Sequence, residues 1–188
     1  MYYHASQTPD IKTLIPKVSN HNEPLIYFSD RKENVLVYLS NAVEKYCKET
    51  GFEYNGIWQK WASYGFTKDG ILELHEYYPN ATWDTYKGVS GYIYYIDEIP
   101  NGKEQKDIPH AYTTDTETKV LKCAFIPDAY EAIMEEVKSG KIVLIKYEQL
   151  SEKFREWNER TIREEYNNAA DHPEYRHFLK GKFDFLNL

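Results

Sequence analysis

Two side chains that suit ligand chemistry, His4 and Tyr27, lie in two short stretches rich in aromatic and apolar residues. Residues 2–6 and 25–29 both have strand-like composition, so we expect two short strands. A histidine exchanges a proton near neutral pH, and a tyrosine offers a ring that packs and a hydroxyl that hydrogen-bonds. Both residues also have a structural interpretation, a hydrogen-bonded histidine and a tyrosine in the core, and the sequence leaves this open.

Other residues with chemical potential also have two interpretations. Glu73 and His75 are two positions apart, so they share one face of a predicted strand and form either an acid–base pair or part of an exposed sheet face. Arg155, Arg160 and Arg163 lie on one long predicted helix rich in Glu and Lys. They either bind phosphate or belong to a solvated helix face.

The two cysteines, Cys47 and Cys123, belong to no CxxC motif, and no histidine lies at a metal-ligand spacing from them. No metal site is therefore predicted. Both lie in amphipathic segments, which favours buried free thiols and a reducing compartment. The chain has no run of 18 apolar residues and no basic segment followed by an apolar one. We therefore expect a cytoplasmic protein without a membrane partner.

The composition is that of an ordinary globular domain, with 188 residues, 41% hydrophobic and 28% charged. Asp and Glu outnumber Lys and Arg by 30 to 23, so the net charge is −7 and a broad nucleic-acid surface is not expected. The chain also contains 18 Tyr. Tyrosine combines a ring that is buried with a polar tip, so many half-buried strand positions or a stacking surface are expected.

Strands and helices alternate irregularly along the chain, which predicts an α+β fold for one domain over residues 1–188, with a helical extension from about 151. Asp30 and Glu33 form a capping-box pattern before a helix that Gly51 ends. Ile11 and Leu14 fit a short helical turn. The other expected elements are strands over 71–78, 90–97, 118–125 and 142–147, helices from 79, 127 and 151, and loops over 16–24 and 99–116.

The segment Tyr3-His4-Ala5-Ser6 resembles the Tyr-His-Gly-Thr/Ser strand of the diphtheria-toxin-like ADP-ribosyltransferases, which include the poly(ADP-ribose) polymerases and the rifampicin ADP-ribosyltransferases. Ile26-Tyr27-Phe28-Ser29 is similar to their second motif, a strand with a Tyr that leads into a helix. Residues 91–96 resemble a later central strand of the rifampicin enzymes, and residues 112–120 lie where the family has its last motif. The resemblance covers roughly residues 2–125 and implies a split mixed β-sheet with peripheral helices.

The resemblance implies that NAD is the substrate and binds in a cleft between the two halves of the sheet. His4 would hydrogen-bond a ribose, the backbone at Ala5 would hold the nicotinamide amide, and Ser6 would assist. Tyr27 would stack on the nicotinamide ring, and Ser29 completes the second cofactor-binding motif. Clamping and stacking of this kind hold a leaving group in position.

The family also has an acidic residue, because a carboxylate stabilises the oxocarbenium character that develops when the glycosidic bond breaks. By resemblance Glu117 is the first candidate, since it precedes a predicted strand as the Glu of the polymerases does. Asp115 and Asp107 are the alternatives, since the rifampicin enzymes use an Asp in the preceding loop. The chain departs from the family pattern where Ala5 replaces Gly. The acceptor of the ADP-ribose, a protein, nucleic acid or small molecule, is not indicated.

Two other functions remain open. An RNA 2′-phosphotransferase would share the fold and use NAD, but that family relies on Arg-rich phosphate contacts, and Arg31 is the only Arg before residue 155. A binding module could keep the fold without catalysis, with the Tyr and Trp residues of 54–95 as its interface. This third hypothesis predicts that the carboxylates lie outside the cleft.

Overall fold

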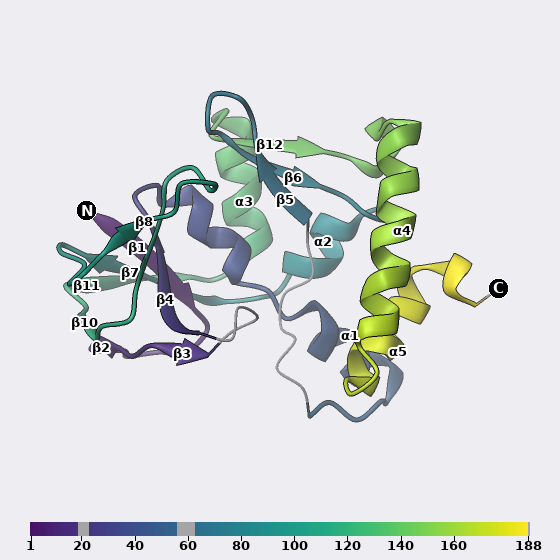
Figure 1. The fold of residues 1–188 in the computed structure, drawn as a ribbon, viewed down its shortest axis with the longest axis horizontal. Helices are drawn as coiled ribbons and strands as arrows, with labels where there is room; N and C mark the ends of the chain where they lie inside the picture. The colour runs from purple at the N-terminus through teal and green to yellow at the C-terminus, as the bar shows by residue number, and fades with distance from the viewer. Residues whose placement is uncertain (19–22, 56–62, 188) are drawn as a thin grey trace.

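The protein is an α+β structure of mostly antiparallel sheets with helices packed around them, as the sequence predicted at this level. The computed structural model describes residues 1–18, 23–55 and 63–187. A large sheet lies at one end of the molecule and the C-terminal helices gather at the other (Figure 1). A smaller sheet and further helices lie between these two ends.

The large sheet contains the two strands that carry His4 and Tyr27. In the described residues its spatial order is β11 (Lys122–Ile126), β7 (Gly91–Ile96), β1 (Tyr2–Ser6), β4 (Pro24–Ser29), β9 (Ala111–Thr114) and β8 (Lys103–Glu104), with β3 (Lys17–Val18) also paired to β4. All of these pairings are antiparallel. β1 forms five residue pairs with β7, whereas its described register with β4 holds one pair, Tyr3 with Ser29. β1 and β4 therefore diverge beyond that pair.

Two smaller groups of strands flank the large sheet. The small sheet has the order β12 (Ile142–Ile145), β6 (Leu72–His75) and β5 (Ser63–Phe66) in the described part of the chain. β5 pairs antiparallel with β6, and β6 pairs in parallel with β12. A separate ladder joins β2 (Thr13–Leu14) to β10 (Thr118–Lys119).

The longest of the described helices lie in the second half of the chain. In chain order they are η1 (Glu33–Tyr38), α1 (Ala42–Thr50), α2 (Ala81–Tyr86), α3 (Ala129–Lys138), η2 (Tyr147–Gln149), α4 (Glu152–Asn168), α5 (Pro173–Lys182) and η3 (Asp184–Leu186), the η elements being 3₁₀ helices. Among the described residues, none of them is both long and apolar enough to cross a membrane.

The two faces of the large sheet are covered by different cores. Side chains alternate between faces along a strand, so Ile26 and Phe28 of β4 face one core with Leu14 and Tyr94. The opposite face packs against η1, α3 and the small sheet, as shown by the core residues Ala5, Val35, Leu36, Val37, Leu72, Ile93 and Ile133. His4 and Tyr27 therefore lie on strands that are held from both sides by buried apolar contacts.

A third core joins the C-terminal helices to α1. Val43, Ile162, Tyr175 and Phe178 come from α1, α4 and α5, and each is at most 2% exposed. α5 approaches α1 closely at Gly181, since a Cβ placed there would lie 1.8 Å from the hydroxyl oxygen of Tyr46. Any larger residue at position 181 would have to displace the Tyr46 ring.

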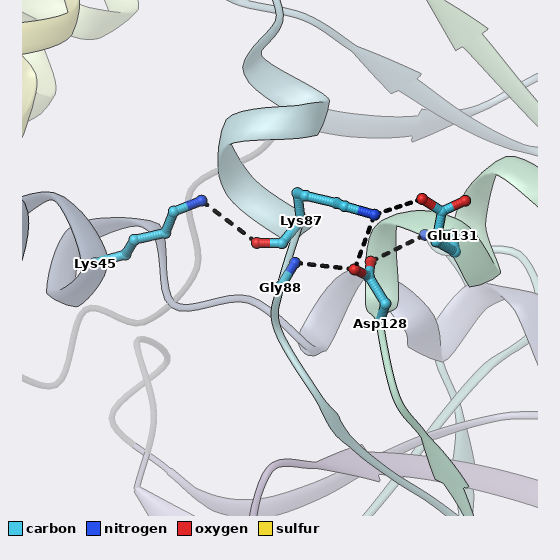
Figure 2. Close-up of polar contacts among 5 residues, drawn as sticks. All are labelled: Lys45, Lys87, Gly88, Asp128 and Glu131. Atoms are coloured by element: carbon cyan, nitrogen blue, oxygen red, sulfur yellow. Dashed lines mark hydrogen bonds and ion pairs between the residues drawn. The ribbon is translucent and has the colours of Figure 1, made fainter.

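A polar network fixes the start of α3 against the segment after α2 (Figure 2). One carboxylate oxygen of Asp128 accepts the backbone N–H of Glu131, and the other accepts that of Gly88, both at 3.1 Å. The Lys87 ammonium bridges the carboxylates of Asp128 and Glu131. Burial acts to raise the pKa of Asp128, but these hydrogen bonds and the Lys87 charge outweigh it and hold that pKa below its ordinary value.

Replacing Asp128 with alanine is expected to lower the free energy of unfolding by about 1–2 kcal/mol, because α3 loses its N-cap and Gly88 loses its acceptor. Urea denaturation at pH 7 measures the loss. Glu131→Gln keeps both backbone bonds and should change stability by less than about 0.5 kcal/mol. The lowered pKa means that Asp128 stabilises the fold above its ordinary pKa of 3.8, and this contribution disappears as the pH falls through the folded-state value. The difference between the wild type and Asp128→Ala should therefore shrink in acid, and a constant difference would contradict this explanation.

The single helix predicted from Asp30 to Gly51 is wrong. The chain forms η1, leaves helical geometry at Leu39 (φ −86°, ψ 66°) and then forms α1. Lys32 occupies the N-cap of η1 without a side-chain hydrogen bond, so the predicted capping box is also absent from the described residues. The apolar spacing continues across the break between η1 and α1 because Leu39 and residues on both sides of it are buried. The spacing of apolar residues therefore does not reveal that the helix is interrupted.

Several predicted loops contain short strands. Leu14 lies in β2 rather than on a helical turn, the region 16–24 contains β3, and the region 99–116 contains β8 and β9. The strand predicted over 118–125 is two strands, β10 and β11, with different partners. Strands of two residues carry almost no local pattern because their hydrogen-bond partners are distant in sequence. Trp58 and Trp61, part of the predicted aromatic interface, lie outside the described residues.

Candidate functional site

A cavity of about 230 Å³ lies where β1 and β4 diverge, and we call it the β1–β4 cavity. It is bounded by these two strands and by the segment from Thr8 to Lys17. Its lining residues are His4, Ser6, Thr8, Ile11, Thr13, Leu14, Ile15, Lys17, Leu25, Ile26 and Tyr27. Three of the residues singled out in the sequence, His4, Ser6 and Tyr27, are therefore brought together at one cavity.

His4 links the two strands through its side chain. Its Nδ1 atom lies 2.9 Å from the backbone oxygen of Tyr27. A carbonyl oxygen only accepts hydrogen bonds, so Nδ1 carries the proton. In the neutral imidazole this leaves Nε2 without a proton. Nε2 can therefore accept a hydrogen bond from a hydroxyl group of a ligand.

The surroundings of His4 favour that neutral form. Burial lowers the pKa of His4 below its ordinary value of 6.5; the hydrogen bond to the Tyr27 carbonyl opposes this change, and the positive charge of Lys17 reinforces it. Charging a buried imidazole beside a cation is unfavourable. At neutral pH the His4 imidazole is therefore neutral, with Nδ1 donating to the protein and Nε2 able to accept a hydrogen bond.

Tyr27 contributes its backbone and its side chain to different contacts. Its carbonyl receives the His4 bond, and its half-buried side chain interacts electrostatically with Tyr38 of η1. The Tyr38 hydroxyl lies 3.1 Å from that of Tyr64. The Tyr27 carbonyl therefore lies beside the cavity, and its side chain lies near Tyr38, which contacts Tyr64 of β5.

The other predicted cofactor-binding residues have mixed positions. Ser6 lines the cavity, and its hydroxyl accepts the backbone N–H of Thr8 at 3.1 Å. Ala5 is 7% exposed, its side chain belongs to the core, and it pairs with Ile93 of β7. Ser29 is 5% exposed and its hydroxyl accepts the N–H of Arg31 at 3.1 Å, so its contact supports the start of η1 rather than the cavity lining.

The three candidate carboxylates, Asp107, Asp115 and Glu117, are exposed, and none is among the lining residues of the β1–β4 cavity. Glu117 and Asp115 are each next to a residue that pairs with the cavity wall, because Thr118 of β10 pairs with Leu14 and Thr114 of β9 pairs with Ile26. Glu117 therefore lies beside the β2 side of the cavity wall and Asp115 beside the β4 side, whereas the described register gives no such link for Asp107.

Sequence reasoning missed Lys17, the only cation that the described lining of the cavity contains. Lys17 lies in β3, where it pairs with Leu25, in a region that looked like a loop. A lysine between Pro16 and Val18 has no distinctive local signal, so only its pairing with β4 reveals it. No arginine appears in that lining, which leaves the Arg-rich contacts of a 2′-phosphotransferase without a counterpart there.

A second polar group was also missed at the other end of β4. Nδ1 of His110 lies 2.8 Å from Oδ1 of Asp30, and the Tyr112 hydroxyl donates to Oδ2 of Asp30 at 3.4 Å. His110 has a left-handed backbone (φ 63°), which is uncommon for a residue other than glycine. These contacts tie the end of β4 to the start of β9, which suits a structural role.

The Glu73–His75 pair does form, with 2.8 Å between His75 Nε2 and Glu73 Oε1, but the His75 ring packs on Phe154 of α4 at 4.8 Å between ring centroids. Among the residues that the structure describes, no group of three or more His, Cys, Asp or Glu side chains is arranged to hold a metal ion. Cys47 is buried as expected, whereas Cys123 is exposed, so the prediction of two buried thiols is wrong for Cys123. It lies on β11, the outer strand of the described sheet.

The chain matches no family model, no curated protein and no solved structure. The class that the structure defines is therefore an α+β protein with a histidine-bridged cavity between two diverging strands of an antiparallel sheet.

Proposed function

We propose that the protein binds NAD at the β1–β4 cavity and transfers its ADP-ribose to an acceptor. The observation that carries the proposal is the hydrogen bond from His4 of β1 to the backbone of Tyr27 of β4, beside a cavity where these strands diverge. The resemblance of the two strand motifs to those of the ADP-ribosyltransferases led us to expect both residues at one site. Their proximity agrees with that expectation and supports the proposal.

The chemistry of the lining suits one end of a dinucleotide. His4 Nε2 would accept a hydrogen bond from a ribose hydroxyl. The Tyr27 ring, which lies on the η1 side of β4, would stack on a nicotinamide that reaches past this strand. The backbone at Ala5 and the Ser6 hydroxyl would hold the amide, and Lys17 would attract the diphosphate. The cavity of about 230 Å³ is smaller than the roughly 300–1,000 Å³ typical of a site that encloses a small molecule, so the rest of NAD would lie outside it.

A carboxylate near the ribose would complete the site, because it stabilises positive charge as the bond to nicotinamide breaks. Glu117 is our first candidate, since it directly precedes β10, as the Glu of the polymerases precedes a strand, and its neighbour Thr118 pairs with Leu14 on the cavity wall. Asp115 and Asp107 remain alternatives. Nicotinamide leaves with the bonding electron pair, and the acceptor attacks the ribose carbon.

A second candidate function is a binding module on the same fold without catalysis. The specific observation that favours it is that all three carboxylates are exposed and outside the described lining of the cavity. The two candidates differ in one measurable property, since only a transferase releases nicotinamide from NAD.

Calorimetric titration of NAD into the wild type and into Tyr27→Ala tests the proposed site. We expect saturable binding that Tyr27→Ala weakens by about 1–3 kcal/mol, the scale of a lost aromatic contact at a binding site. Tyr147→Ala, which removes a half-buried tyrosine far along the chain from the cavity, should leave the affinity unchanged. If millimolar NAD gives no heat of binding, NAD is not a ligand of this site, and the binding module becomes the better proposal.

A further inference from the structure

A second, larger groove lies at the other end of the molecule, between α4 and the C-terminal segment that follows α5, and we call it the α4 groove. Its volume is about 510 Å³. Figure 1 shows α4 running past α5 and the end of the chain at this side of the molecule. The groove is lined by Tyr77, Tyr78, Pro79, Tyr147, Glu152, Arg155, Glu156, Asn158, Glu159, Lys182, Phe183, Asp184 and Phe185.

Aromatic side chains give the groove fixed walls. Tyr77, Tyr78 and Phe183 are each at most 9% exposed, and the rings of Tyr78 and Phe183 meet edge to face with centroids 5.6 Å apart. Such rings provide apolar surface and electron-rich faces that attract cations. The groove therefore has a rigid lining that suits a side chain combining an apolar stem with a positive charge.

Both cations of the lining are already engaged within the chain. The Arg155 guanidinium donates to the backbone oxygen of Tyr147 at 3.1 Å and lies 4.8 Å from the centroid of the Tyr147 ring. Lys182 forms an ion pair with Asp84 and lies 5.5 Å from the centroid of the Tyr78 ring. The groove thus offers little free positive charge to an anionic ligand.

Three carboxylates of the groove, unlike its two cations, have no partner within the described part of the chain. Glu152, Glu156 and Asp184 form no ion pair or side-chain hydrogen bond within the described part of the chain. Glu152 and Glu156 are four residues apart, so they lie on the same face of α4, whereas Glu159 is held by Arg163 through a contact of 2.7 Å. The free charge of the groove is therefore negative.

A buried amide adds an independent requirement for a donor. Asn158 is 4% exposed, and its Nδ2 donates to the backbone oxygen of Tyr77 at 3.1 Å. Its Oδ1 is buried and has no hydrogen-bond partner among the residues described. Buried polar atoms are nearly always paired, so an unpaired acceptor in the lining of a groove calls for a donor from a ligand.

We propose that the α4 groove binds a basic peptide segment of a partner protein. An Arg or Lys side chain lies between Glu152 and Glu156 with its stem on the aromatic walls, and a donor of the segment satisfies Oδ1 of Asn158. Charge excludes a nucleic acid as the occupant, because the free groups of the groove are acceptors and the chain carries a net charge of −7. The proposal is independent of NAD, because the α4 groove and the β1–β4 cavity share no lining residue.

Fluorescence anisotropy with a labelled nonapeptide of alternating Gly and Arg tests the proposal. We expect saturable binding to the full chain, weakened about tenfold or more in the double variant Glu152→Gln/Glu156→Gln. The matched control is Glu148→Gln/Glu164→Gln, which makes the same change in net charge at exposed residues outside the groove lining. This control should bind like the wild type, and Asp184→Asn should weaken binding on its own.

Three outcomes would overturn the proposal. Equal weakening in both double variants would show attraction to the overall charge rather than to the groove. Equal binding of a peptide with citrulline in place of arginine would show that the charge is not recognised. Saturable binding of spermine together with no binding of the peptide would make a free polyamine, not a partner protein, the occupant. Because all substituted residues are exposed, the variants should unfold at the wild-type temperature, which circular dichroism checks.

Discussion

Replacing Phe178 with alanine is expected to lower the free energy of unfolding by about 3–5 kcal/mol, the usual cost of removing a buried phenylalanine ring. Phe178 is 0% exposed, and its ring meets that of Tyr46 edge to face at 5.8 Å between centroids. It lies in the core that joins α5 to α1. The substitution leaves a cavity at the contact that holds the C-terminal helices to the rest of the chain.

Urea denaturation followed by tryptophan fluorescence and by circular dichroism measures this effect. Phe125→Ala is the matched control, because Phe125 is the same residue type on β11 but is 56% exposed; its loss should be below about 1 kcal/mol. Coincident transitions in the two signals are expected, since the extension from about residue 151 shares its core with α1. A loss no larger than that of Phe125→Ala would show that the helices contribute little to the stability of the domain.

Replacing His4 with alanine is expected to slow release of nicotinamide from NAD by about 100-fold, the scale of a misplaced reacting group. Under the proposed function His4 has two roles. Its Nδ1 holds β1 to the Tyr27 carbonyl of β4, and its Nε2 receives a ribose hydroxyl. Alanine removes both the bridge between the strands and the acceptor in the cavity. Chromatographic measurement of nicotinamide, with water as the acceptor, follows the rate without knowledge of the natural acceptor.

His4→Asn separates the two roles, because the asparagine amide can still donate to the Tyr27 carbonyl but does not place an acceptor where Nε2 lies. We expect His4→Asn to unfold like the wild type and yet to release nicotinamide as slowly as His4→Ala. His172→Ala, at a histidine outside the described lining of the cavity, should keep the wild-type rate. A wild-type rate in His4→Asn would limit His4 to a structural role. No release from the wild type itself would favour the binding module.

Local patterns located several elements correctly. The strand predicted over 90–97 is β7, the run from Ile142 forms β12, and helices begin near Pro127 and Ser151, as α3 and α4 do. Asp128 and Ser151 are N-caps whose side chains accept backbone N–H groups of the first helical turn. Such features depend on neighbouring residues in the chain, so the sequence contains the information needed to predict them.

The candidate site depends on contacts that no local pattern records. His4 and Tyr27 could be selected from their strands, but Lys17 enters the cavity because β3 pairs with β4. Glu117 and Asp115 could be selected from a motif, but their positions beside the cavity wall depend on the pairing of β10 with β2 and of β9 with β4. Pairing between segments far apart in sequence decides which side chains meet.

The sequence by itself determined the α+β class, the strands that carry His4 and Tyr27, and the absence of a long apolar segment. These follow from composition, periodicity and helix caps, which act over a few neighbouring residues. Only the tertiary structure decided that β1 and β4 share a single pair and then diverge, that the C-terminal helices pack on α1, and that acceptors without partners collect in the α4 groove. Each of these features arises from side chains of distant segments meeting in one core, where burial and hydrogen bonding outweigh local preference.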